Sequence, residues 1–192
     1  KRQHHHLWDP QQNDHPWLRE NSMIPFRYGD YSALKTRFML EHYDAVTANW
    51  DVVASVTMEG EWNPEDPTGE AIWMQALADE RGRPAAHVAQ AWLDQDDHDE
   101  VLACYAMLPI VRSVRHKPWA STQPDGKPSG MRDLAFMRGF AKLADAGLHF
   151  DLQTPWWHLD DVPYLVEQSP STTVILNHAG LPADRSKEGL SA

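Results

Sequence analysis

The sequence is poor in cysteine and in basic residues, and it contains no long hydrophobic run. Its single cysteine, Cys104, excludes an intrachain disulfide. Lysine and arginine number 17 against 28 acidic residues, which gives a formal net charge of −11 and no basic cluster for a phosphate backbone. No stretch approaches the roughly 18 apolar residues that a membrane span needs, and the polar start Lys1-Arg2-Gln3 lacks the apolar core of a signal peptide. Neither nucleic acid nor a membrane is therefore expected as a partner, and we expect a cytoplasmic protein.

The chain does have enough apolar material for a core. Hydrophobic residues make up 42% of its 192 residues, and a single domain over residues 1–192 is the natural interpretation. Strand patterns alternate with helix patterns along the whole chain. After a first strand at His4 to His6, strands are predicted over 51–58, 85–92, 109–115, 148–153 and 171–177, and helices over 31–49, 70–81, 97–107, 131–146 and 159–168. Such alternation predicts parallel strands with right-handed crossovers.

Two α/β folds compete for this pattern, an open doubly wound sheet and a (β/α)₈ TIM barrel. No Gly-x-Gly-x-x-Gly follows the first strand, so the dinucleotide-binding form of the open sheet loses its main support. In a barrel the chemistry lies at the carboxyl ends of the strands. Polar residues stand at those ends here: His4, His6, Glu59, Arg115, His116, Gln153 and His178. We therefore predict a TIM barrel truncated to about its first six β/α units, with strands 7 and 8 missing from the sequence.

The first strand carries three consecutive histidines. Alternate residues of a strand point to the same face, so His4 and His6 can present two imidazoles together while His5 points away. A tag remnant would also give a histidine run, but the bulky residues and turn signal of Leu7-Trp8-Asp9-Pro10 follow at once and argue against one. A strand with His-x-His is suited to metal binding or acid/base chemistry.

Five segments together resemble the amidohydrolase-related family of TIM-barrel hydrolases, which includes lactonases acting on sugar lactones, such as fuconolactonase, and on pyrone dicarboxylates. They are His4 to Pro10, Met58 to Trp62 with Gly69-Glu70, Val111 to His116, Gly147 to Gln153, and Ile175 to Pro182. The resemblance implies that His4, His6 and His178 are the catalytic residues, either as metal ligands or as polarising groups for a substrate carbonyl. It also implies an aspartate on an eighth strand, which has no counterpart in this sequence.

The resemblance suggests hydrolysis of a lactone, a cyclic carboxylic ester, by a lactonase-like hydrolase. Neutral imidazoles can hold a divalent ion such as zinc or manganese, which polarises the lactone carbonyl and activates water. Histidines can also donate to the carbonyl oxygen without a metal, and the sequence leaves both mechanisms open. Arg112 and Arg115 lie three apart and point to opposite faces of their strand, and we favour Arg115 as the fork for a substrate carboxylate. The other expected substrate-binding residues are Glu59, His116, Gln153 and Trp157.

Two alternatives to a lactonase stay open. A decarboxylase or hydratase of the same superfamily would also use histidines beside an arginine. A non-catalytic truncated form or assembly partner would account for the missing strands, and a homo-oligomer would then cover the open sheet edge.

Overall fold

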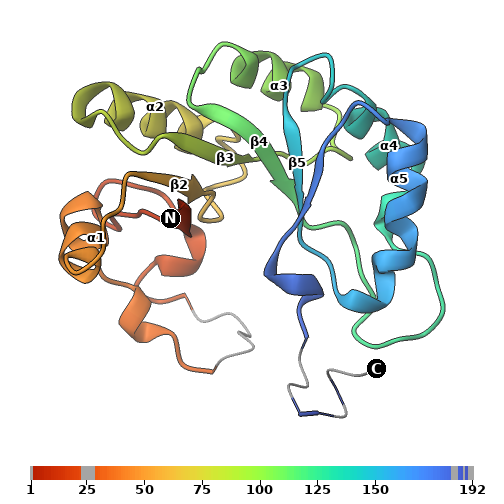
Figure 1. Ribbon diagram of the computed structural model, residues 1–192, viewed down its shortest axis with the longest axis horizontal. Helices are drawn as coiled ribbons and strands as arrows, with labels where there is room; N and C mark the ends of the chain where they lie inside the picture. The colour runs from red at the N-terminus through yellow and green to blue at the C-terminus, as the bar shows by residue number, and fades with distance from the viewer. Residues whose placement is uncertain (1, 23–28, 183–185, 188, 190–192) are drawn as a thin grey trace. The chain divides into compact units, whose positions relative to one another are not determined.

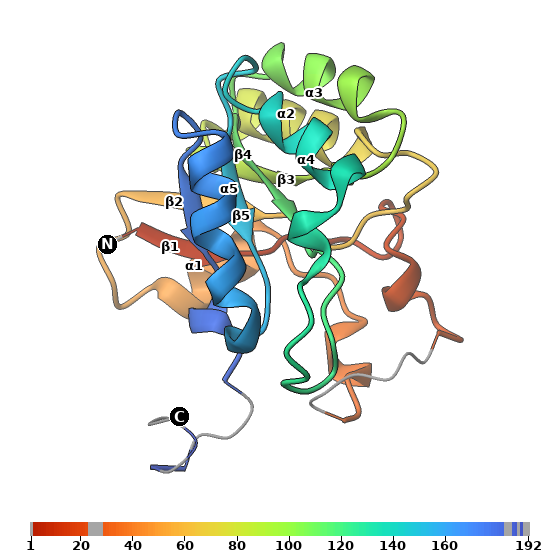
Figure 2. The same cartoon turned by 90° about the vertical axis from the view of Figure 1, so that its right-hand side faces the viewer.

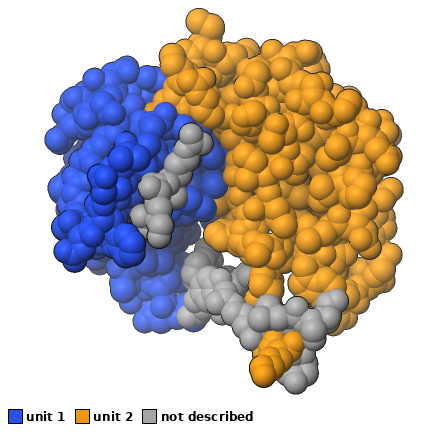
Figure 3. Space-filling view, in the orientation of Figure 1, with its two compact units in different colours: residues 1–90 blue, residues 91–192 orange. Residues whose placement is uncertain are grey.

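The computed structural model describes residues 2–22, 29–182, 186, 187 and 189. The chain divides into two compact units, which Figure 3 colours separately. Unit 1 comprises residues 1–90 and unit 2 comprises residues 91–192. We describe each unit by itself.

Unit 1 is built on three parallel strands that are neighbours in chain order (Figure 1). Strand β1 (Arg2–His5) pairs with β2 (Ala54–Met58), and β2 pairs with β3 (Ala86–Gln90). Helix α1 (Leu40–Thr47) connects the first two strands, and α2 (Gly69–Arg81) connects the second and third. Two short 3₁₀ turns, η1 (Pro16–Leu18) and η2 (Ser32–Leu34), precede α1. The sheet register places His4 beside Val56 and His5 beside Thr57.

Unit 2 repeats the same plan with β4 (Val111–His116), β5 (His149–Leu152) and β6 (Val174–Leu176), again parallel and in chain order. Helix α3 (His98–Ala106) precedes β4, and α4 (Leu134–Ala141) and α5 (Val162–Gln168) follow β4 and β5 (Figures 1 and 2). The 3₁₀ turns are η3 (Gly130–Arg132), η4 (Trp156–Asp161) and η5 (His178–Gly180).

The core of unit 2 lies between its strands and α4. Phe136 and Phe140 of α4 meet Phe150 of β5 edge to face, with ring centroids 5.8 and 5.3 Å apart. Val114 and Leu152, which alternate onto this same face of the sheet, are fully buried. The face away from α4 therefore carries the other alternating residues, which include Ser113, Arg115 and Asp151. The two sheet faces thus differ in kind, one aromatic and covered by helices and the other polar.

The structure confirms the predicted fold class, because six parallel strands alternate with helices as in the first six units of a (β/α)₈ barrel. Two helices are shorter than predicted by eight or more residues. The helix expected over 31–49 begins only at Leu40, because Phe38 pairs with Trp8 in an antiparallel bridge. The helix expected over 131–146 is interrupted at Asp133, whose backbone is extended. In the part of the chain that the structure describes, no helix is long and apolar enough to cross a membrane.

Candidate functional site

The His-x-His pair has the arrangement that the strand alternation predicts. His5 stacks on Tyr43 of α1, with ring centroids 3.9 Å apart, so it lies on the helix-covered face of β1. His4 and His6 lie on the opposite face, His4 exposed and His6 half-buried. Their Nε2 atoms are 3.4 Å apart. Two imidazole nitrogens therefore converge on one point at the carboxyl end of β1.

Backbone carbonyls of the neighbouring strand fix the tautomer of His6. Its Nδ1 lies 3.0 Å from the carbonyl oxygens of both Met58 and Glu59. A carbonyl oxygen only accepts, so Nδ1 must carry the proton and donate it. The lone pair of His6 then resides on Nε2, the atom that faces His4. A histidine that ligates a metal is oriented by the same kind of bond from its other ring nitrogen.

Glu59 follows β2 in a tight turn and is buried. Its Oε2 accepts the backbone N–H of Glu61 at 2.7 Å, and Glu61 adopts the left-handed conformation with φ 59°. Gly60, between the two glutamates, donates its N–H to Oε1 of Glu70 in the first turn of α2. The turn is thus held from both sides, and it presents the carbonyl of Glu59 to His6.

The carbonyl of Gly60 accepts hydrogen bonds from two further side chains, neither of which is among the site residues predicted from the sequence. Nδ1 of His15 donates to it at 3.0 Å and Nε1 of Trp17 at 2.7 Å. His15 is buried against Trp62, and this burial lowers its pKa below the usual value for histidine. A Cβ at Gly60 would lie 3.0 Å from Cε1 of His15, so a larger residue here would push the His15 ring back by a few tenths of an ångström. His15 and Trp17 therefore stabilise, through their hydrogen bonds to Gly60, the turn that supports His6.

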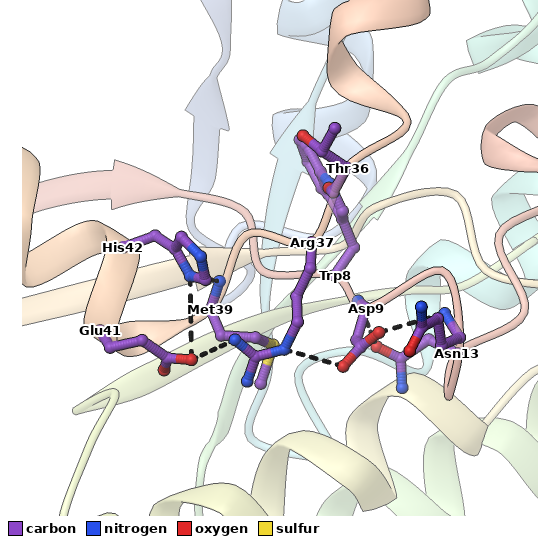
Figure 4. A network of polar contacts seen from close by, with 9 residues as sticks. Trp8, Asp9, Asn13, Thr36, Arg37, Met39, Glu41 and His42 are labelled. Atoms are coloured by element: carbon purple, nitrogen blue, oxygen red, sulfur yellow. Dashed lines mark hydrogen bonds and ion pairs between the residues drawn. The ribbon is translucent and has the colours of Figure 1, made fainter.

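A network of polar contacts fixes the chain as it leaves β1 (Figure 4). Arg37 lies between two carboxylates: its Nε donates to Oδ2 of the buried Asp9 at 2.9 Å, and its guanidinium also pairs with Glu41. Trp8 donates its indole N–H to the carbonyl of Thr36 at 2.8 Å. The Trp8 ring is held with its centroid 6.2 Å from that of His6. It forms an aromatic wall beside the histidine pair.

In unit 2 the two adjacent residues Arg115 and His116 occupy opposite faces of β4. The ring of His116 packs against Trp92 and Phe136, with centroids 5.3 Å from each, which places it on the face covered by α4. Its Nδ1 accepts the backbone N–H of Leu93 at 3.2 Å, and burial lowers its pKa to about 4. These are contacts of a histidine in the core. We therefore leave His116 out of the proposed site, although the sequence predicts it there.

Arg115 lies on the other face and is buried, 4% exposed. Its register partner on β5 is Asp151, so the two residues are neighbours on the polar face. Gln153 is half-buried just beyond the end of β5, and His178 is exposed just beyond β6. Of the sequence-predicted residues, Arg115 thus lies near the carboxyl end of β4, and Gln153 and His178 lie just beyond the carboxyl ends of β5 and β6.

Trp157 lies in η4 and takes part in a cluster with Ser121 and His158. Its indole N–H donates to Oγ of Ser121 at 3.1 Å. Ser121 and His158 have the residue types of a nucleophile and its base, and Oγ lies 3.1 Å from Nε2. The backbone N–H of Ser121 donates to the same Nε2, however, and Oγ donates to the carbonyl of Gln123 at 2.7 Å. The cluster therefore anchors a loop and does not activate a nucleophile.

Asp151 is a polar residue that the sequence analysis missed. It is 3% exposed, and its carboxylate accepts hydrogen bonds from Oγ of Ser113 at 2.5 Å and from Nδ2 of Asn177 at 2.8 Å. The signal that could have revealed it is strand alternation, because Asp151 has the same parity in its strand as Gln153.

His4 and His6 are the residues of unit 1 that fit a metal ion best. Among the described residues, no group of three or more histidine, cysteine, aspartate or glutamate side chains is arranged to hold one. The convergent Nε2 atoms and the donating Nδ1 of His6 nevertheless give a two-nitrogen donor set of the type that zinc accepts. His178 belongs to unit 2.

Comparisons with known proteins agree with this architecture. A solved amidohydrolase structure from Burkholderia multivorans with bound Zn has a TM-score of 0.70 at 21% identity, over 98% of this chain and 61% of that one. A probable 2-pyrone-4,6-dicarboxylic acid hydrolase from Acinetobacter baumannii, solved with citric acid, has a TM-score of 0.62 at 13% identity, over 93% of this chain and 58% of that one.

In sequence, the uncharacterized protein y4mH of Sinorhizobium fredii is 31% identical over 186 residues, which cover 94% of this chain and 62% of that protein. The chain therefore spans less than two thirds of the length of each of these relatives. The family model described as Amidohydrolase matches residues 3–191, nearly the whole sequence. This chain belongs to the amidohydrolase family.

Proposed function

We propose that the protein is a hydrolase that opens a lactone by attack of water beside the histidines at the end of β1. The observation that carries the proposal is the pair of Nε2 atoms 3.4 Å apart, together with the Nδ1–H of His6 donated to backbone carbonyls. The family match and the zinc in a related structure support it. His178 is kept as the third histidine on the family resemblance alone.

The two histidines would hold a divalent ion, zinc or manganese, through their Nε2 atoms. Such an ion, when bound, polarises an ester carbonyl and lowers the pKa of water towards about 7. The protein would keep both imidazoles neutral and oriented with Nε2 toward the ion. The carbonyls of Met58 and Glu59 do this for His6, because they hold the proton on Nδ1. In a metal-free mechanism a histidine would instead donate to the carbonyl oxygen, which His6 can do from Nε2 only when its ring is protonated there as well.

Arg115 is the proposed anchor for a substrate carboxylate. A planar guanidinium binds a carboxylate through two parallel hydrogen bonds, and a buried one does so with little competition from water. The name of the pyrone-dicarboxylate hydrolase relative supports a carboxylated lactone as the substrate class. Glu59, Gln153 and Trp157 remain the other proposed substrate-binding residues, and a homo-oligomer remains a prediction.

The test is a panel of neutral and carboxylated lactones, 2-pyrone-4,6-dicarboxylate among them, offered to the purified chain with zinc, with manganese and after chelation. Ring opening forms one carboxylic acid per turnover, so a pH-stat follows it directly. We expect the chain to hydrolyse a carboxylated lactone. In Arg115→Lys the KM for that lactone should rise at least tenfold, while the hydrolysis of any neutral lactone should be unchanged. Release of carbon dioxide without ring opening would instead assign a decarboxylase, and no turnover under any condition would overturn the proposal.

A further inference from the structure

The buried carboxylate of Asp151 joins three neighbouring strands of unit 2. Ser113 on β4 donates to Oδ2, and Asn177, which immediately follows β6, donates to Oδ1. All three side chains are at least nine-tenths buried. Burying a carboxylate is unfavourable unless hydrogen bonds compensate it, so an acid at this position needs a reason beyond packing.

Asn177 stands where the chain changes conformation. Its backbone N–H still belongs to the sheet and donates to the carbonyl of Leu152 at 2.8 Å. Directly afterwards the backbone becomes left-handed, with φ values of 51° at His178, 51° at Ala179, 73° at Gly180 and 54° at Leu181. A residue with a Cβ in this region is strained by about 1 kcal/mol or more, and the conformation persists only where its surroundings hold it.

Several contacts hold this left-handed turn. Leu181 donates its N–H to the carbonyl of His178 at 3.0 Å, and Gly180 donates to the carbonyl of Asn177 at 3.3 Å. A Cβ at Gly180 would lie 3.2 Å from Cα of Trp156, so the turn is pressed against η4. The side chain at the start of the turn is Asn177, and its amide is held by Asp151.

We propose that Asp151 is the positioning residue of His178. Asp151 holds the amide of Asn177, Asn177 fixes the end of β6, and this fixed end sets the strained backbone conformation from which the His178 side chain leaves the sheet. The inference rests on the proposed function only in giving His178 a part in the reaction. The role requires the hydrogen bond between Asp151 and Asn177 and does not require the negative charge.

Four single substitutions separate the effect of the hydrogen bonds of Asp151 from the effect of its charge. Asp151→Asn keeps both contacts without the charge, because its amide oxygen can accept from Asn177 and its NH₂ can donate to Oγ of Ser113. Asp151→Ala removes both contacts, and Asn177→Ala removes the one that leads to His178. Ser113→Ala is the matched control, since it removes a hydrogen bond of the same carboxylate but leaves the contact between Asp151 and Asn177 intact.

The experiment is NMR on the metal-free full chain. The ring nitrogen signals of His178, assigned with a His178→Gln variant, are recorded together with the hydrogen exchange of the Leu181 amide. We expect Asp151→Ala and Asn177→Ala to shift the ring signals and to raise the exchange rate at least tenfold. We expect Asp151→Asn and Ser113→Ala to remain within about twofold of the unmodified chain.

Two outcomes overturn the inference. If Asn177→Ala leaves the His178 ring signals and the Leu181 exchange unchanged, the turn holds itself and Asp151 positions nothing. If Asp151→Asn behaves as Asp151→Ala does, the charge is what matters. Asn177→Ala decides the question even if Asp151→Ala fails to fold. Neither readout needs a substrate. If the chain opens no lactone, the proposed function is wrong, but the NMR spectra still test the inference about Asp151.

Discussion

The Nε2 atoms of His4 and His6 lie 3.4 Å apart, and His6 is held in place through its other ring nitrogen by the carbonyls of Met58 and Glu59. Two neutral nitrogens that converge in this way predict zinc binding, because a single ion can accept both lone pairs. Calorimetric titration of zinc into the metal-free chain should therefore give an affinity that falls at least tenfold in His4→Ala and in His6→Ala.

His5→Phe is the control for this titration, because His5 stands between the two histidines but lies on the opposite face of β1. Its zinc affinity should match that of the unmodified chain. A zinc affinity that is unchanged in His4→Ala would show that the pair His4 and His6 does not form a metal site.

The same His5→Phe variant should be more stable than the unmodified chain. Both ring nitrogens of His5 are buried without a well-formed hydrogen bond in the described structure, with only a weak contact to the backbone of His6, while the ring stacks on Tyr43. Phenylalanine keeps the stacked ring and removes the two unsatisfied nitrogens, and we expect the free energy of unfolding to rise by about 1 kcal/mol. Urea unfolding at pH 7.5 measures it. A Tyr43→Leu variant, which removes the stacking instead, should lose stability, and a loss in His5→Phe would show that the nitrogens have partners.

Stability should fall as the pH falls from about 6.5 to about 4, and His116 should be one cause. Burial lowers its pKa to about 4 in the folded chain, against 6.5 when unfolded. Within this window the unfolded chain binds the proton and the folded chain does not, so acid favours unfolding. The difference between the two pKa values corresponds to on the order of 3 kcal/mol. The facing carboxylate of Asp94, whose Oδ1 lies 3.8 Å from Nε2, offsets only part of the burial effect.

The measurement is urea unfolding at several pH values with His116→Asn as the comparison. Asparagine offers Oδ1 to the Leu93 N–H, as Nδ1 of histidine does, but it does not titrate. The variant will be less stable at neutral pH because it is smaller. Its slope between pH 6.5 and 4 should nevertheless be shallower, and an unchanged slope would assign the acid sensitivity to other groups.

Ser121 should not react as a nucleophile. Its hydroxyl donates to the carbonyl of Gln123, and its backbone N–H takes up the Nε2 of His158 that a base would need. A fluorophosphonate, which labels activated serines, should therefore give no adduct by intact mass. A stoichiometric adduct mapped to Ser121 would instead establish a serine hydrolase. In Ser121→Ala we expect a loss of about 1 kcal/mol of stability, since the indole N–H of Trp157 loses its acceptor and the carbonyl of Gln123 loses its donor.

Strand alternation predicted more of the site than any motif did. It placed His4 and His6 on one face and His5 on the other, and it separates Arg115 from His116, because adjacent residues of a strand point to opposite faces. Applying the same rule to β5 places Asp151 on the face that carries Arg115. Arg115 and His116 are both expected in the site because they stand at the same strand end, and Asp151 is not, although the alternation separates the first pair and joins Asp151 to Gln153.

Other features could not be predicted because their partners are backbone atoms. His15 and Trp17 converge on the carbonyl of Gly60, more than 40 positions away in the sequence. A carbonyl group is present at every residue and leaves no trace in the pattern of side chains. The delayed start of α1 has a similar origin, since the bridge between Trp8 and Phe38 overrides the helical periodicity that begins near Tyr31.

Gly139 in α4 should not tolerate a methyl group, contrary to its position in a helix. Alanine at an ordinary helical position is favoured over glycine by about 1 kcal/mol. A Cβ at Gly139 would lie 2.2 Å from the carbonyl oxygen of Leu93, and backbone atoms cannot move aside as a flexible side chain can. Either α4 shifts away from Leu93 or the chain around Leu93 is displaced. We expect Gly139→Ala to lower the free energy of unfolding by about 3 kcal/mol.

Ala141, which is exposed on the same helix, provides the opposite substitution. Ala141→Gly should lose at most about 1 kcal/mol, the difference between the two residues in a helix interior, because Ala141 is the last residue of α4. Urea unfolding of both variants at pH 7.5 compares the two effects within one element. If Gly139→Ala proves as stable as the unmodified chain, α4 does not approach Leu93 this closely, and the contact that seats Phe136 and Phe140 against β5 is looser than the structure has it.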